Sequence, residues 1–142
     1  DSRQSRGLGD VYKRQPSEAE WVAAVRGGSK TLYPWGDEAS SINANWGQEW
    51  KGHMPTKEVG SFAPNGYGIY DGIGNVWEWT STEYLPYDDR VVSTDHKKRY
   101  VLRGGDWFVQ PSEVSVYSRL ALEPLVRGLM DGGVGFRCVL GA

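Results

Sequence analysis

The amino-acid sequence predicts an α+β fold that is rich in loops and has few regular elements. Three observations lead to this prediction: one short helical segment with clear end signals, several strand-like segments in the C-terminal third, and a long Gly-, Asn- and Trp-rich stretch between them that has little periodicity. One helix, several strands and long connections are typical of an α+β domain. No internal repeat is visible in the sequence.

The composition indicates one compact domain with an aromatic core or an aromatic binding surface. The 142 residues include 16 Lys and Arg against 18 Asp and Glu, and this net charge of −2 excludes a basic nucleic-acid-binding module. Hydrophobic residues make up 39% of the chain and aromatic residues 13%. Seven Trp and eight Tyr are unusual in so short a chain, because each ring buries a large area and needs a partner for its polar tip.

The sequence has few residues for disulfides or for a soft-metal site. Cys138 is the single cysteine, so no internal disulfide can form, and two histidines, His53 and His96, are too few for a His and Cys zinc cluster. Neither histidine has a histidine partner at helical spacing, and each is interpreted as a solvated loop residue. No apolar run approaches membrane-spanning length.

The first fifteen residues differ in character from the rest of the chain. Residues 1–15 (DSRQSRGLGDVYKRQ) are charged and show neither helical nor strand periodicity, and the pattern changes abruptly at Pro16. This segment resembles the translated adapter sequence that contaminates assembled environmental reads. We therefore expect residues 1–15 to be a non-native or disordered leader, with a natural flexible arm as the alternative.

A helix is predicted over residues 18–26. Ser17 followed three residues later by Glu20 forms a capping box, Arg26 falls in the last turn, and Gly27 with Gly28 ends the helix. The stretch that follows, residues 27–64, is interpreted as a long, ordered loop that aromatic residues hold in place.

The remaining elements follow from turn and strand signals. A turn is predicted at Asn65-Gly66, and the residues expected to be buried after it are Ile69, Val76, Trp77 and Trp79. Residues 84–98 read as a polar loop, and strands are predicted over residues 100–103, 114–119 and 135–140. Arg103 and Arg137 flank glycines in these strands, where a planar guanidinium can bond several carbonyls and join loops that lack regular ladders.

Five segments carry a resemblance to a known family. They are PSEAEW with RGG (16–28), YPWGDE (33–38), NGYGIYDGIGNVWEWT (65–80), VLRGGDWF (101–108) and GFRCV (135–139). Together they resemble the formylglycine-generating-enzyme-like family, or sulfatase-modifying-factor domain, a Gly- and Trp-rich variant of the C-type lectin fold. Family members carry a substantial region before the capped helix. The resemblance therefore implies that residues 16–142 are the C-terminal part of such a domain.

The resemblance bears on catalysis through two positions. Oxidase members of the family convert a sulfatase cysteine to formylglycine with a pair of copper-binding cysteines placed shortly after the RGG-x-W motif. Aligned on Trp107, these positions fall on Val109 and Val114, whereas a copper(I) site needs soft thiolates. We expect neither copper nor a catalytic residue in this chain. An oxidase or related enzyme of the same family, with its catalytic parts missing or altered, stays open as the alternative.

Calcium is the one metal that the sequence supports. Asp71 and Glu78 bracket a Gly-rich turn whose carbonyls could complete an oxygen shell. The family resemblance implies a structural calcium site formed by these two side chains and the carbonyls of Gly74 and Val76. In the alternative, Asp71 caps the turn and Glu78 pairs with an arginine such as Arg103.

Apolar residues between Trp107 and Gly133 suggest a binding surface. Only some of them can point inward from a hairpin and its loop, so we expect an exposed apolar patch, which marks a partner site; ordinary core residues under a long loop are the alternative. The arrangement resembles the variable proteins of diversity-generating retroelements. That resemblance implies the following ligand-contacting positions: Asp106, Phe108, Val109, Tyr117, Leu120, Leu122, Leu125, Val126, Gly128 and Leu129.

These observations favour a noncatalytic domain that binds a protein or other macromolecular ligand through residues 108–130. The domain is expected to have a retroelement-diversified surface and a structural calcium ion. An accessory domain that only supports a neighbouring domain is a third interpretation.

Overall fold

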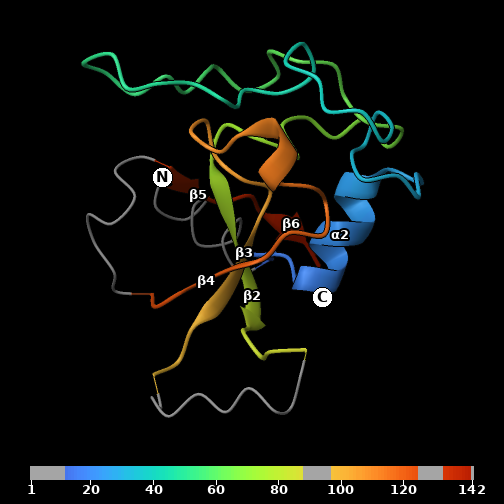
Figure 1. Ribbon diagram of the computed structural model, residues 1–142. Helices are drawn as coiled ribbons and strands as arrows, with labels where there is room; N and C mark the ends of the chain where they lie inside the picture. Colours follow the sequence, from blue (N-terminus) through green and yellow to red (C-terminus); the bar gives the residue numbers. More distant parts are fainter. Residues whose placement is uncertain (1–11, 88–96, 125–132, 142) are drawn as a thin grey trace, which may run out of the picture.

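The computed structural model describes residues 12–87, 97–124 and 133–141 (Figure 1). The elements in chain order are β1 (Lys13–Arg14), α2 (Glu18–Arg26), β2 (Trp77–Glu83), β3 (Tyr100–Arg103), the 3₁₀ turn η1 (Pro111–Glu113), β4 (Leu120–Leu122), β5 (Val134–Gly135) and β6 (Val139–Leu140). One helix, short strands and long loops confirm the predicted α+β class. None of the helices in these described ranges is long and apolar enough to cross a membrane.

Helix α2 has the predicted bounds and the predicted end structures. Ser17 Oγ accepts a hydrogen bond from the Glu20 backbone N–H at 3.2 Å, and Glu20 Oε1 accepts one from the Ser17 N–H at 3.0 Å. Gly27 ends the helix in the left-handed conformation at φ +60°. The helix buries Trp21 and Val25 against the rest of the domain.

The main sheet has four strands in the order β4-β3-β2-β5. Strand β2 pairs antiparallel with β3, with Glu78 opposite Arg103, and parallel with β5, with Glu78 opposite Gly135. The central strand β2 was not predicted as a strand, because the glycines before it and its three aromatic and acidic residues in a row gave no clean alternation. Trp77 is buried as expected, whereas Ile69, Val76 and Trp79 are half-buried.

The predicted strand over residues 114–119 is wrong. The strand in this region is β4, and residues 114–119 form an irregular turn in which the Ser118 N–H donates to the Ser115 carbonyl at 3.1 Å. Arg103 Nη1 donates hydrogen bonds to the carbonyls of Val116 and Ser118, at 3.2 and 3.3 Å. These carbonyls therefore bond a side chain and not a neighbouring strand. The prediction that Arg103 joins loops through their carbonyls is thereby confirmed.

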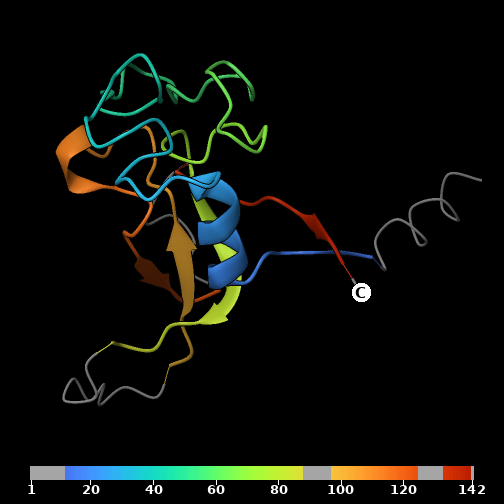
Figure 2. The same cartoon turned by 90° about the vertical axis from the view of Figure 1, so that its right-hand side faces the viewer.

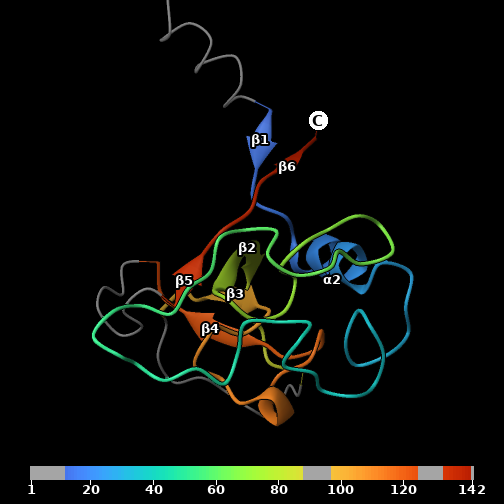
Figure 3. The same cartoon turned by 90° about the horizontal axis from the view of Figure 1, so that it is seen from above.

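The predicted strand over residues 135–140 is divided into two short strands. Strand β5 belongs to the main sheet, whereas β6 pairs with β1 in a separate two-stranded ribbon, with Lys13 opposite Leu140. Figures 2 and 3 show this ribbon projecting away from the helix and the main sheet. Residues 12–15, which belong to the predicted leader, therefore take part in the fold.

The core consists of two neighbouring clusters of buried side chains. One surrounds Trp21 and includes aromatic residues from the loops, and the other lies on the main sheet around Leu102. Tyr33 stacks on Trp35 at 5.2 Å between ring centroids and meets the edge of Trp46 at 5.4 Å. These contacts confirm an aromatic-pinned loop, and Figure 1 shows the loops of residues 27–75 gathered at one end of the sheet.

Candidate functional site

The loop that follows β3 is held by a buried carboxylate. Asp106 Oδ1 accepts hydrogen bonds from the N–H groups of Phe108 and Val109, at 2.9 and 3.0 Å. Asp106 is 5% exposed, and this burial raises the pKa of its carboxyl group, although its backbone hydrogen bonds act in the opposite direction. The carboxylate thus fixes the turn that presents Phe108 and is not itself displayed on the surface.

The two positions that the resemblance assigns to copper ligands lie close together and are apolar. A Cβ atom built on Gly105 would stand 2.9 Å from a methyl group of Val114 and 3.0 Å from a methyl group of Val109. Val114 is buried, and Val109 packs against both core clusters. The fold therefore brings the two positions together, and both carry valine side chains in place of cysteine thiols.

The other predicted ligand contacts fall into two exposed positions and two half-buried ones. Phe108 is 61% exposed and Tyr117 45% exposed. Leu120 and Leu122, on β4, are half-buried and pack against the sheet cluster. Four further contacts lie outside the described residues: Leu125, Val126, Gly128 and Leu129. Of the predicted contacts that the structure describes, Phe108 and Tyr117 are thus the exposed ones.

A loop distant in sequence lies against the Phe108 turn. The N–H groups of Gly47 and Gln48 donate to the carbonyls of Val109 and Trp107, both at 2.8 Å. Two residues further along, Trp50 is 59% exposed. The sequence did not predict that this loop contacts the Phe108 turn, because the two segments lie about sixty residues apart and share no local pattern. The tryptophan at position 50 was the one sequence signal in this loop.

All four predicted calcium ligands line one hollow. Asp71, Gly74, Val76 and Glu78 share it with Arg137 and with the exposed side chains of Val59, Tyr70 and Phe136. The Asp71 carboxylate accepts a hydrogen bond from the Gly60 N–H at 2.7 Å. Two carboxylates and backbone carbonyls are ligands that calcium accepts, so the residues present are compatible with this ion.

The partner of Glu78 is Arg137, and Arg103 pairs elsewhere. Arg137 Nε donates to Glu78 Oε2 at 2.7 Å and Arg137 Nη2 to Oε1 at 2.6 Å, while Trp21 Nε1 also donates to Oε2 at 2.7 Å. Arg137 Nη2 further contacts the carbonyls of Tyr70 and Asp71, at 3.0 and 3.1 Å, which confirms the expected loop-joining role of this arginine. A calcium ion would share Glu78 with this guanidinium.

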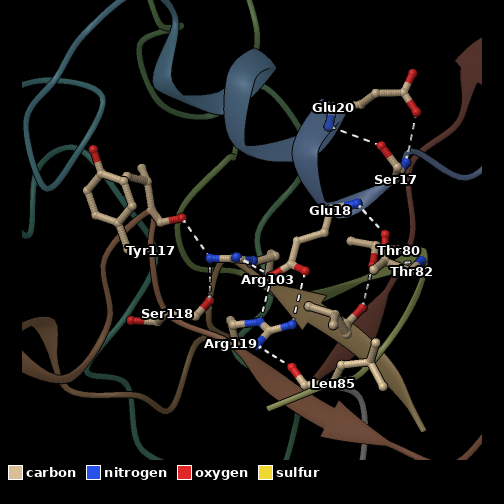
Figure 4. A network of polar contacts seen from close by, with 12 residues as sticks. Ser17, Glu18, Glu20, Thr80, Thr82, Leu85, Arg103, Tyr117, Ser118 and Arg119 are labelled. Atoms are coloured by element: carbon tan, nitrogen blue, oxygen red, sulfur yellow. Dashed lines mark hydrogen bonds and ion pairs between the residues drawn. The ribbon is translucent and has the colours of Figure 1, made fainter. Parts of the chain in front are cut away.

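A second charged cluster joins α2 to the sheet (Figure 4). The Glu18 carboxylate accepts hydrogen bonds from Arg119 at 2.6 and 3.1 Å and from Arg103 Nη2, and the Glu18 N–H donates to Thr82 Oγ1 at 2.8 Å. The side chains of Glu18 and Arg103 are 14% and 4% exposed. The sequence did not predict that Glu18 pairs with these two arginines, because Arg103 and Arg119 lie 85 and 101 residues further along the chain.

The remaining soft ligands are not gathered in the described part of the chain. Cys138 is exposed with a free thiol, and His53 is exposed. Within residues 12–87, 97–124 and 133–141, no three His, Cys, Asp or Glu side chains form a cluster that could hold a metal ion. His96 lies outside these ranges.

Comparisons with known proteins agree with this geometry. The family model for the sulfatase-modifying factor enzyme 1-like domain matches residues 5–142. The chain is 43% identical over 149 residues to the formylglycine-generating enzyme of Thermomonospora curvata, an alignment that covers 89% of this chain and 48% of that protein. It is 34% identical over 146 residues to the inactive C-alpha-formylglycine-generating enzyme 2 of Bos taurus. That alignment covers 92% of this chain and 44% of the Bos taurus protein.

A solved structure gives the same result. Treponema denticola variable protein 1 matches 89% of this chain and 46% of its own, with a TM-score of 0.68 and 28% sequence identity. The chain therefore belongs to the formylglycine-generating-enzyme-like family and has its variant of the C-type lectin fold. It spans about half the length of the relatives that it matches.

Proposed function

We propose that this chain is a noncatalytic domain of the formylglycine-generating-enzyme-like family that binds a protein or other macromolecular ligand. The observation that carries the proposal is the apolar pair at Gly105. Val109 and Val114 stand where the family resemblance places the copper cysteines, and hydrocarbon side chains cannot bind copper(I). The existence of a relative named as inactive is consistent with a family member that has lost the oxidase chemistry.

The binding half of the proposal rests on the exposed residues of the same region. Phe108 stands out from a turn that Asp106 fixes, and Tyr117 is exposed on the next loop. A rigid backbone that displays aromatic side chains loses little conformational freedom when a ligand binds. This arrangement supports ligand binding through residues 108–130.

A copper assay tests the noncatalytic half. The chain is incubated with copper(I) and a sulfatase-type cysteine peptide, and the peptide is followed by mass spectrometry. We expect no formylglycine product and no copper(I) captured from a chromogenic chelator. The double variant Val109→Cys/Val114→Cys should capture copper(I), whereas the single variant Val109→Cys should not match it. Copper-dependent oxidation of the peptide by the unmodified chain would overturn the proposal and favour the enzyme of the same family.

Sequencing of the source locus tests diversification. We propose that codons for the surface between residues 106 and 129 are varied by a retroelement, which the likeness to a variable protein of Treponema denticola supports. The expected finding is a nearby imperfect copy of the segment that differs mainly at adenines, accompanied by a reverse transcriptase gene. Variation should concentrate at exposed Phe108 and Tyr117 and spare buried Val114 and Val116. A neighbouring sulfatase gene, without such a copy, would contradict it.

We also propose a structural calcium ion at Asp71, Gly74, Val76 and Glu78. Its support is the hollow that these residues share and the hardness of their oxygen atoms. When bound, the ion would supply positive charge that holds the Gly-rich turn in place. Arg137 already neutralises Glu78, so Asp71 is the carboxylate on which calcium binding would depend most.

A further inference from the structure

A groove on the outer face of α2 has its own chemistry. It is lined by the small and apolar helix residues Ala19, Val22 and Ala23, and by Arg26, Tyr87 and Tyr117. Glu18 and Arg103 also line it; their side chains are largely buried and belong to the charged cluster of Figure 4. We call this hollow the α2 groove.

Among the residues that the structure describes, positive charge exceeds negative charge in and under the α2 groove. Glu18 is the one acidic side chain among the described lining residues, and it is already shared by Arg103 and Arg119. One carboxylate against two guanidinium groups leaves one positive charge, and Arg26 adds another. Because the cluster is largely withdrawn from water, solvent screens this charge less than it would on an open surface.

Arg103 also keeps an unused donor. Its Nη1 atom bonds two carbonyls and its Nη2 atom bonds Glu18, but its buried Nε has no hydrogen-bond partner among the described residues. Buried donors are nearly always satisfied, so an unpaired one in a side chain that is 4% exposed is unusual. This donor has almost no accessible surface, so a ligand in the groove would feel it only through the positive charge of the Arg103 guanidinium, which favours a negatively charged group there.

Two arginine and tyrosine stacks border the site. Arg26 lies 5.9 Å from the ring centroid of Tyr117, and Arg119 lies 4.2 Å from that of Tyr87. Arg119 already uses its N–H groups on Glu18 and on the Leu85 carbonyl. Arg26 bonds the Ser29 carbonyl through Nε, and its terminal N–H groups have no hydrogen-bond partner among the described residues, so they can receive a carboxylate. The α2 wall between these stacks offers only alanine and valine side chains, which suits an aliphatic neighbour of that carboxylate.

We infer that the α2 groove binds an acidic peptide segment of a protein partner, with an Asp or Glu carboxylate near Arg26 and an aliphatic side chain against Ala19 and Ala23. A peptide is favoured over a free small anion because the groove combines charge with an apolar wall. The inference rests on the proposed ligand-binding function. It specifies the kind of ligand that would bind at the Tyr117 end of the proposed binding surface.

The test selects peptides from a phage-displayed library of random dodecapeptides on the immobilised chain. We expect the enriched peptides to contain Asp or Glu next to aliphatic residues. Synthetic copies should bind Arg26→Gln about tenfold more weakly, because a charge-assisted contact is lost, and should also weaken on Tyr117→Ala. Lys51→Gln removes one positive charge from a loop residue outside the groove and should leave binding unchanged. Melting temperatures establish that each variant is folded.

Two results would overturn the inference. In the first, the enriched peptides contain no acidic residues and no longer bind the Phe108→Ala variant. The proposed ligand-binding function would then stand, but the α2 groove would not be its site. Acidic peptides that bind Arg26→Gln and Tyr117→Ala as tightly as the unmodified chain would place their site elsewhere.

Discussion

Glu78 and Arg137, 59 residues apart, form a two-pronged ion pair beneath the Gly-rich turn, with N–O distances of 2.6 and 2.7 Å. Glu78 is buried and Arg137 is about a quarter exposed, with the side chains at 7% and 28% exposure. The pair ties the central strand β2 to the segment between β5 and β6, and through Arg137 to the carbonyls of Tyr70 and Asp71.

Removal of one member of this pair should strongly destabilise the domain. Glu78→Gln leaves Arg137 without a counter-charge. Breaking a fully buried pair in this way costs about 3 to 5 kcal/mol, and we expect a smaller loss here because the Arg137 side chain is partly exposed. Urea unfolding followed by tryptophan fluorescence measures the change. The control is Glu20→Gln, which breaks the exposed pair between Arg14 and Glu20 and should change the free energy of unfolding much less. Equal effects of the two variants would contradict a special role for the buried pair.

Gly105 should not tolerate a side chain. Its φ of +74° is strained for any other residue, and a Cβ atom would approach Val114 and Val109 within 3.0 Å. Gly105→Ala should therefore cost about 2 to 5 kcal/mol, the sum of backbone strain and overpacking. Gly52 has a similar φ of +82° and nothing within 4 Å of its Cβ position, so Gly52→Ala isolates the strain at about 1 to 2 kcal/mol. If both variants lose the same stability, the valines do not crowd this position.

Asp106 should make stability depend on pH in the direction opposite to an ordinary ion-paired acid. Burial raises the pKa of its carboxyl group, so the folded state holds the proton more tightly than the unfolded state. This contribution to stability is therefore complete below the ordinary pKa of Asp and is lost as the pH rises through the raised value. Asp106→Asn keeps an oxygen for the Phe108 and Val109 N–H groups and removes the charge.

The measurement for Asp106 compares the unfolding free energies of the unmodified chain and Asp106→Asn across the acidic range. We expect the variant to be at least as stable at pH 7 and its advantage to shrink as the pH falls. A variant that is much less stable at pH 7 would mean that the charged carboxylate is needed to hold the Phe108 turn.

Calcium should raise the melting temperature through Asp71. A ligand that binds only the folded chain stabilises it by mass action, and Asp71→Ala should abolish that rise. Differential scanning fluorimetry with calcium, and with magnesium as the control ion, measures the shift. Equal calcium-induced shifts in the unmodified chain and in Asp71→Ala, or none in either, would contradict the site.

Local signals in the sequence were sufficient for local structure. Ser17, Glu20 and Gly27 act on backbone groups within a few residues, so the bounds of α2 could be predicted. The Asn65 turn is equally local, since the Gly68 N–H donates to the Asn65 carbonyl. The resemblance carried by the five segments identified the family correctly, and residues 100–103 form the predicted strand.

The sequence by itself thus determined the helix with its ends, the Asn65 turn, the loop-joining role of Arg103 and Arg137, and the fold class. Only the tertiary structure decided which groups distant in sequence pair with one another. Glu78 pairs with Arg137, and Glu18 pairs with two arginines. Gly47 and Gln48 bond the backbone of the Phe108 turn. The tertiary structure also divided the predicted strand over residues 135–140 between β5 and β6. Capping and turn formation depend on neighbours in the chain, whereas the pairing of charges and strands depends on which surfaces the core brings together, and no local pattern encodes that choice.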